Sequence, residues 1–249
     1  MLFKLKYQTM VTLPPEMIYK IASFLKSHRD IYALADVFQN LRFKLVNAVD
    51  YEIYETTLKD KFIVEKVIYT GDQMITFPAH LKLLKFYRHF NQPITLHLSE
   101  KLETIYFGSK FNQPVDGLLP KNLQRLIFSG NFNQPLDNLP SKLQELNLGE
   151  LFNHPLNHLP KNLKKLWIRH SFKHSLDQLP DSIETLHIMC HYIRKINKLP
   201  NNIKILRTWT TFPEDYSGER ELDYLKELYP HLTINYSLGF GNYTRWDVF

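Results

Sequence analysis

The chain has 249 residues and a formal net charge of +6, with 44% hydrophobic and 22% charged residues. This composition is that of a globular protein with a sizeable core, and it excludes a disordered chain. No run approaches the ~18 apolar residues of a membrane helix, so we expect no membrane-spanning segment. The N-terminal stretch lacks the pattern of a secretory signal, and one cysteine, Cys190, excludes an internal disulfide framework and fits a reducing compartment.

Leucine, alanine and proline are unevenly distributed along the chain. Leucine occurs 38 times and alanine 5 times, and the 14 prolines outnumber the 8 glycines, which reverses average usage. Four of the five alanines precede residue 51, whereas ten prolines lie between Pro78 and Pro200. This segregation predicts a helical N-terminal piece joined to a piece of different construction.

Residues 13–45 have the spacing of amphipathic helices. Asp30 is a suitable N-cap for a second helix, and a third helical stretch is expected through Leu41, Leu45 and Val49. We therefore expect three short helices that pack together within residues 1–50. The apolar positions of the first helix, at i, i+3/i+4 and i+7 spacing, are Met17, Ile18, Ile21, Phe24 and Leu25.

The order of residues in this piece, L-P-x-E-x-I-x-x-I-x-x-F-L and then D-I-x-x-L-x-x-V, resembles the F-box. In that family the helical bundle docks on the Skp-type adaptor of a cullin–RING ubiquitin ligase, so the resemblance implies an adaptor-binding role. The alternative is a helical cap over the open end of the repeat array that follows, because such an end exposes apolar surface. The positions that match the family are Leu13, Pro14, Glu16, Ile18, Ile21, Phe24, Leu25, Asp30, Leu34 and Val37.

The middle of the chain is a repeat array. Four copies of Phe-Asn-(Gln/His)-Pro stand at fixed spacing, and the period is 21 residues twice and then 20 residues four times. Residues 77–89 match the second half of the unit, and the opening motif decays in the last two units. The six units cover residues 90–110, 111–131, 132–151, 152–171, 172–191 and 192–211.

Each unit contains Leu-Pro, a run of the L-x-x-L-x-L kind and the Phe-Asn-x-Pro turn. The run predicts a short strand whose alternate residues point into the core, and each proline turns the chain because it lacks an amide N–H. The recurring asparagine predicts a hydrogen-bond ladder. One unit cannot bury its own apolar face, so neighbouring units must stack. The inward rows start at Leu81, Leu84, Phe86 and Phe90 and recur once per unit.

These features resemble the leucine-rich-repeat solenoid and, through the Phe-Asn-x-Pro quartet, the FNIP repeat family over residues 77 to about 212. The fold class implied is α+β: a short helical F-box-like bundle followed by a solenoid with a parallel sheet of short strands. Proteins of this family occur chiefly in amoebae and in the giant viruses that infect them, which implies a similar origin.

The expected domains follow from this division. We expect a first strand at residues 63–69, and a helix, a turn at Pro230 and a closing strand within residues 222–236. The boundaries are 1–50 for the F-box-like domain, 51–89 for a linker and a partial first repeat, 90–211 for the FNIP repeats and 212–249 for a C-terminal cap.

The outward residues of the strands do not repeat from unit to unit. A scaffold that keeps its core and varies one sheet face presents a binding surface, and Tyr, Trp and Arg are enriched in interface hot spots. We therefore predict that a target protein binds this face; the alternative is a solvated face with no ligand. The predicted contact residues are Lys85, Tyr87, Tyr106, Arg125, Trp167, Arg169, His187, Arg207 and Trp209.

Charge also divides along the chain. Residues 81–211 hold 18 basic and 9 acidic residues, a net +9, whereas residues 212–249 hold 3 basic and 7 acidic residues, a net −4. The basic solenoid favours an acidic partner by electrostatic steering. Nucleic acid is the rival, because basic residues near aromatic ones also suit single strands, but many of the lysines lie in turns and need not form one stripe.

No motif indicates catalysis. The chain lacks a phosphate-binding glycine loop, G-x-S-x-G and H-E-x-x-H. The pairs His154/His158 and His170/His174 fall on turns, so they are not expected to share a face for zinc, and Cys190 has no oriented third group beside it. We therefore expect no enzyme, no catalytic residue, no metal and no cofactor.

The combined prediction is a substrate-recognition subunit of a cullin–RING ubiquitin ligase. Its F-box would bind the Skp-type adaptor, and its solenoid would bind a target protein in the cytoplasm, or in the host cytoplasm or nucleus if the chain is viral. The alternative is a protein–protein interaction solenoid with no link to ubiquitin.

Overall fold

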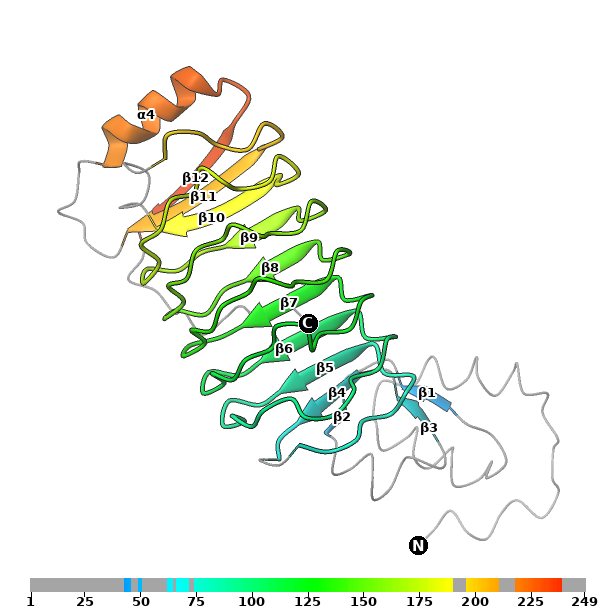
Figure 1. Cartoon of the computed structure of the whole chain (residues 1–249). Helices are drawn as coiled ribbons and strands as arrows, with labels where there is room; N and C mark the ends of the chain where they lie inside the picture. The colour runs from blue at the N-terminus through cyan, green and yellow to red at the C-terminus, as the bar shows by residue number, and fades with distance from the viewer. Residues whose placement is uncertain are drawn as a thin grey trace, which may run out of the picture.

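The computed structural model describes residues 43–45, 49–50, 62–64, 66–71, 74–189, 196–210 and 218–238. These residues form a stack of coils along one axis, and the coils contribute short strands that all run in the same direction (Figure 1). The described part is therefore almost entirely a parallel β-solenoid, with one helix near its C-terminal end.

The main sheet contains ten strands, all paired in parallel, in the order β12-β11-β10-β9-β8-β7-β6-β5-β4-β2. From β4 onward, each strand pairs with the strand of the preceding coil, so the spatial order follows the chain. Two further strands, β1 (Phe43–Leu45) and β3 (Phe62–Val64), pair with each other. The strands of the main sheet are β2 (Val49–Asp50), β4 (Lys66–Tyr69), β5 (Leu83–Phe86), β6 (Thr104–Phe107), β7 (Arg125–Phe128), β8 (Glu145–Asn147), β9 (Lys165–Trp167), β10 (Thr185–Met189), β11 (Ile205–Thr210) and β12 (Thr233–Leu238).

The strands pair in a register that places equivalent residues of neighbouring units beside each other. Leu126 of β7, for example, is paired with Ile105 of β6 on one side and Leu146 of β8 on the other. Because the side chains of a strand alternate between its two faces, this register also aligns every inward row through the stack. The predicted inward rows are confirmed: the described positions equivalent to Leu81, Leu84, Phe86 and Phe90 are all buried.

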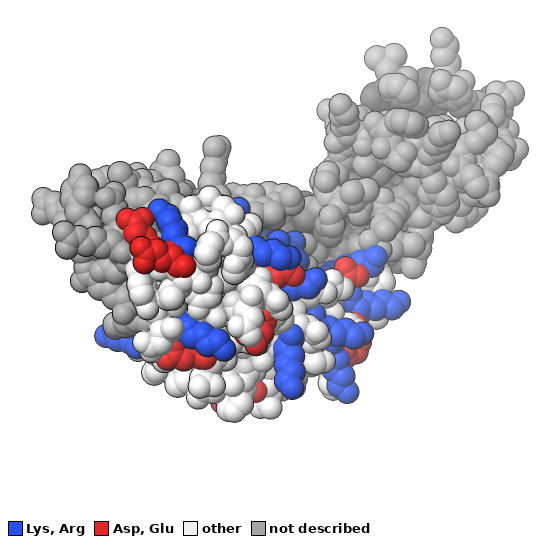
Figure 2. Space-filling view, turned by 90° about the horizontal axis from the view of Figure 1, so that it is seen from above, with Lys and Arg blue, Asp and Glu red and all other residues white. Residues whose placement is uncertain are grey.

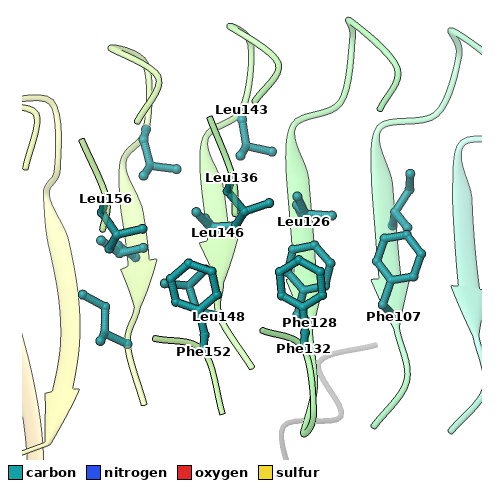
Figure 3. Packing of buried hydrophobic residues seen from close by; sticks show 14 of the residues in the cluster. Phe107, Leu126, Phe128, Phe132, Leu136, Leu143, Leu146, Leu148, Phe152 and Leu156 are labelled. Carbon is teal, nitrogen blue, oxygen red and sulfur yellow. The ribbon is translucent and has the colours of Figure 1, made fainter. Parts of the chain in front are cut away.

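Phenylalanine rings form the centre of the core. Within one coil, Phe128 and Phe132 stack with ring centroids 3.6 Å apart, and between coils Phe132 stacks on Phe111 and on Phe152, each at 6.2 Å. Figure 3 shows Phe128, Phe132 and Phe152 beside leucines of the neighbouring strands, such as Leu126, Leu146 and Leu148. Each fully buried phenylalanine contributes about 1.5–3 kcal/mol from apolar area removed from water, so the repeated ring is a main source of stability.

The Leu-Pro sequences make the turn that leads into each strand. The amide N–H of Leu123 donates to the carbonyl of Pro120 at 3.1 Å, and Leu143 bonds in the same way to Pro140 at 3.0 Å. Proline has a fixed φ and no N–H, so it suits the start of such a turn and cannot extend a strand. The turn places Leu123 in the core directly before β7.

The predicted asparagine ladder is confirmed and joins successive coils. Each Asn side-chain oxygen accepts the amide N–H of the equivalent residue in the next coil: Asn91 from Asn112 at 2.8 Å, and Asn112 from Asn133, Asn133 from Asn153 and Asn153 from Lys173, each at 2.9 Å. The last bond survives although Lys173 is not an asparagine, because the donor is a backbone group.

The C-terminal end of the stack also follows the prediction. Helix α4 (Gly218–Leu228) precedes β12, and the turn between them contains Pro230 and a hydrogen bond from the Leu232 amide to the Tyr229 carbonyl. Leu225 of α4 is buried, and the Tyr229 hydroxyl accepts the Leu199 amide at 2.9 Å. In this last coil the helix thus stands where the other coils have turns, and it covers part of the core.

The predicted α+β class with an N-terminal helical bundle is wrong. The one helix of the described residues is α4, at the opposite end of the chain, and the stretch expected to be helical through Leu45 and Val49 contains β1 and β2 instead. The physical reason is pairing: β1 lies in register with Phe-Ile-Val of β3, whose aromatic and β-branched residues favour strands, and this tertiary contact overrides helical spacing. The remaining residues of that prediction, including 13–37, lie outside the described residues.

The first predicted strand, residues 63–69, is divided in the structure. Phe62–Val64 pairs with β1, and only Lys66–Tyr69 enters the main sheet, where it pairs with β5. The sheet therefore begins earlier in the chain than the repeat motif itself.

The asparagine ladder can be tested by substitution. We expect Asn133→Ala to lower the free energy of unfolding by about 1–3 kcal/mol, because it leaves the Asn153 amide without its acceptor. Urea unfolding followed by circular dichroism measures the change. Asn157→Ala is the control: Asn157 is exposed and forms no hydrogen bond within the described residues, so it should alter stability by less than about 0.5 kcal/mol. Equal effects of the two substitutions would contradict a stabilising ladder.

Candidate functional site

The candidate site is the face of the main sheet that points away from the core. Along β5 and β7 buried residues alternate with half-buried ones, so this face is lined by the residues between the inward leucines and phenylalanines. Strand register places the residues of its middle row side by side across the sheet. We call this surface the outer sheet face; its middle row is Lys85, Tyr106, Ile127, Asn147, Trp167, His187 and Arg207.

The predicted contact residues differ in exposure. Arg207 is exposed and Tyr87 is 41% exposed, whereas most of the others are half-buried. Trp209 lies in β11, in register with Met189 of β10, and its side chain is outside the described part of the structure. The half-buried members are Lys85, Tyr106, Arg125, Trp167 and Arg169.

His187 belongs to this face, yet its side chain is buried, with 2% exposure. Its ring stacks on Trp167 of the preceding strand, with centroids 4.5 Å apart and an angle of 21° between the planes. The sequence predicted a contact residue at this position because its strand position is outward. Its burial makes it instead a support that holds the indole of Trp167 in place.

The surroundings of His187 also keep its imidazole neutral. Burial, followed by repulsion from Arg207, Arg169 and Lys165, lowers the pKa of His187 to about 3. At neutral pH the ring therefore carries no charge, so it adds no positive charge to that of the three neighbouring cations.

Arg125 and Glu145 form the best-defined polar pair of the face. The guanidinium donates Nε to Glu145 Oε2 at 3.0 Å and Nη2 to Oε1 at 3.2 Å, a two-pronged contact between paired positions of β7 and β8. Burial alone would lower the pKa of Arg125, but the hydrogen bonds and the attraction of Glu145 outweigh it and raise that pKa. Such a fork fixes both side chains in direction, so this part of the face is rigid before any partner arrives.

Two glycines at the edge of this face have a structural reason. A Cβ on Gly108 would lie 2.3 Å from the Tyr87 carbonyl oxygen, and a Cβ on Gly149 would lie 3.0 Å from the Gly130 carbonyl oxygen. The backbone of one coil therefore approaches the next too closely for a side chain at Gly108. Packing between coils therefore explains part of the sequence variation in this row, and binding need not explain all of it.

The histidines that invited a metal interpretation have other partners. In His154 and His174 the Nε2 atom is paired with the Asn carbonyl of the preceding coil, at 3.1 and 3.0 Å. Gln134, at the equivalent position, donates its Nε2 to the Asn112 carbonyl of its preceding coil at 3.3 Å. His158 contacts Asp137. Among the described residues no group of three His, Cys, Asp or Glu side chains could hold a metal ion.

The residues predicted to bind an adaptor, from Leu13 to Val37, lie outside the described residues. Within the part of the chain that the structure does describe, no helix is long and apolar enough to cross a membrane.

Comparison with known proteins supports the repeat assignment. The family model described as FNIP Repeat matches residues 111–151, which contain two of the four intact Phe-Asn-x-Pro motifs. The structure shows that the same coil geometry continues on both sides of this match. A search of curated proteins gave no match. Fold and match together define a repeat solenoid of the kind used in protein–protein interaction.

The buried imidazole predicts a specific dependence of stability on pH. The folded pKa of His187 lies far below its ordinary value of 6.5, so below pH 6.5 the unfolded chain takes up a proton that the folded chain does not. The free energy of unfolding should therefore fall as the pH falls from 6.5, by up to about 1.4 kcal/mol per pH unit. Urea unfolding of wild type and His187→Gln, compared at neutral pH and about pH 5, measures this; parallel pH profiles would contradict it.

Proposed function

We propose that this chain is a binding scaffold whose outer sheet face holds a target protein. The observation that carries the proposal is the contrast between the two faces of one sheet. The inward rows repeat Leu and Phe from coil to coil, whereas the outward row changes at every coil and includes Tyr106, Trp167 and Arg207. Solenoids use such extended surfaces to bind other macromolecules.

The geometry of the face supports this proposal because its large side chains are already held in place. Trp167 is fixed by its stack on His187, and Arg125 is fixed by Glu145. Side chains that are ordered before binding lose less conformational entropy on association. Trp and Arg are also the residue types most often found at interface hot spots.

The finer proposal is that the chain is the recognition subunit of a cullin–RING ubiquitin ligase, acting in the cytoplasm or nucleus. Its support is the sequence pattern of residues 13–37, which resembles the F-box, and the order of the two modules. In this role the chain itself catalyses nothing; it raises the effective concentration of a target near the ubiquitin-loaded enzyme.

Target binding can be tested by comparing two double variants in a quantitative co-purification. Trp167→Ala/Arg169→Ala should lower the amount of copurifying protein at least about tenfold relative to wild type. Hot-spot truncations each cost more than about 1 kcal/mol of binding free energy. The control is Tyr224→Ala/Lys161→Ala, which removes an exposed aromatic and an exposed cation elsewhere.

Thermal unfolding must first show that both variants are folded. The binding proposal fails if every protein that binds wild type is retained equally by the two variants.

Adaptor binding needs a separate test. We expect purified Skp-type adaptor to be captured by wild type and lost with Leu13→Asp/Ile21→Asp, because a buried carboxylate in an apolar contact is strongly unfavourable. Lys20→Asp/Ser23→Asp, at two positions that the F-box pattern leaves open, should retain capture. No capture by wild type would remove the ligase role and leave the interaction scaffold.

A further inference from the structure

One region of the outer sheet face combines an aromatic stack with several cations. Trp167, His187 and Arg207 are paired across β9, β10 and β11, so their side chains are neighbours in one row. Lys165 lies two residues before Trp167 in β9, and Arg169 follows two residues after it. We call these five residues the basic aromatic patch.

All three cations of the patch lie within electrostatic reach of one buried ring. Lys165, Arg169 and Arg207 each act on the buried imidazole of His187, which lies among them. Lys165 and Arg207 are exposed, and within the described residues neither forms an ion pair. The patch therefore places two solvent-exposed cations, Lys165 and Arg207, near the indole ring of Trp167.

The nearest described carboxylates are already engaged. Glu145, which is paired with Lys165 across β8 and β9, makes its two hydrogen bonds to Arg125. Glu184 precedes β10 and accepts a hydrogen bond from Lys204 at 2.7 Å, although its pKa is also lowered by the charges of Lys164 and Lys165. Lys165 and Arg207 are thus left as exposed cations without an ion pair within the described residues.

We propose that the basic aromatic patch binds an acidic peptide segment of the target protein. This proposal rests on the proposed function and names the chemistry of the partner. Carboxylates would lie against Lys165 and Arg207, where the planar guanidinium can make a two-pronged contact. A flat or apolar group of the same segment would pack on the indole of Trp167.

The extent of the patch favours a peptide over nucleic acid. It covers three neighbouring strands, and at about 4.8 Å per strand this is roughly 10 Å. The same row continues with Asn147 and Ile127, which carry no charge. A single-strand binder needs a longer basic groove with several aromatic platforms. In the view of Figure 2, Lys and Arg gather mainly on one side of the described stack but have Asp and Glu among them.

The test uses the full chain and two labelled probes. One is a short peptide rich in Asp and Glu with a single Tyr; the other has the same sequence with Asn and Gln in place of the acids. Fluorescence anisotropy should show binding of the acidic probe at low salt, weakening as salt screens the charges. We expect the amide probe to bind at least about tenfold more weakly.

Charge reversal locates the binding. Lys165→Glu/Arg207→Glu should weaken binding of the acidic probe by at least about tenfold, whereas Lys121→Glu/Lys161→Glu should leave it within about twofold. The second variant changes the net charge equally, but its residues lie in the exposed turns before the strands. Equal weakening by the two variants would assign binding to the overall charge of the solenoid and overturn the proposal.

Three further outcomes are informative. A labelled single-stranded RNA that binds more tightly than the peptide, and is lost with Lys165→Glu/Arg207→Glu, would assign the patch to nucleic acid and overturn the proposal. If copurifying proteins are lost with Trp167→Ala/Arg169→Ala but the acidic probe does not bind, the acidic chemistry is wrong and the target-binding face stands. If the probe binds at the patch and no protein is lost, the proposed function fails instead.

Discussion

The structure depends on one constraint: a coil of 20 or 21 residues has an apolar face that it cannot bury by itself. Burial requires the next coil to lie in register, and every repeated feature serves that register. The strands pair residue by residue, the phenylalanine rings stack at about equal spacing, and the asparagine side chains bond to the next backbone amide. Stability is therefore shared between neighbouring coils, as in other solenoids.

The same constraint decides which positions can differ between coils. An inward leucine has neighbours in two coils, so a change there disturbs three units at once. Outward residues such as Ile127 and Asn147 do not belong to the core cluster, so a change there leaves the stacked rows in place. Packing thus confines sequence variation between the coils largely to the outer sheet face. At Gly108, however, the neighbouring backbone leaves no room for a side chain, so even this face is not fully open to change.

Charge on the solenoid follows the same division. Many lysines lie in or beside the turns that precede the strands, and one of them, Lys204, forms an ion pair with Glu184 of the preceding coil. On the outer sheet face, Arg125 is balanced by Glu145, whereas Lys165 and Arg207, beside Trp167 and His187, form no ion pair within the described residues. Part of the net +9 charge of residues 81–211 is therefore placed on the outer sheet face beside an aromatic stack.

The sequence by itself determined the repeat, its period, the inward rows, the two turns and the asparagine ladder, because each depends on a local motif that recurs at fixed spacing. It also determined the closing helix and strand at residues 222–236, where a helical period is followed by Pro230. Only the tertiary structure decided that Phe43–Leu45 and Val49–Asp50 are strands, since their pairing partners lie far along the chain and outweigh helical spacing. It alone showed that His187 is buried, because alternation along a strand gives the face of a residue but not what surrounds it.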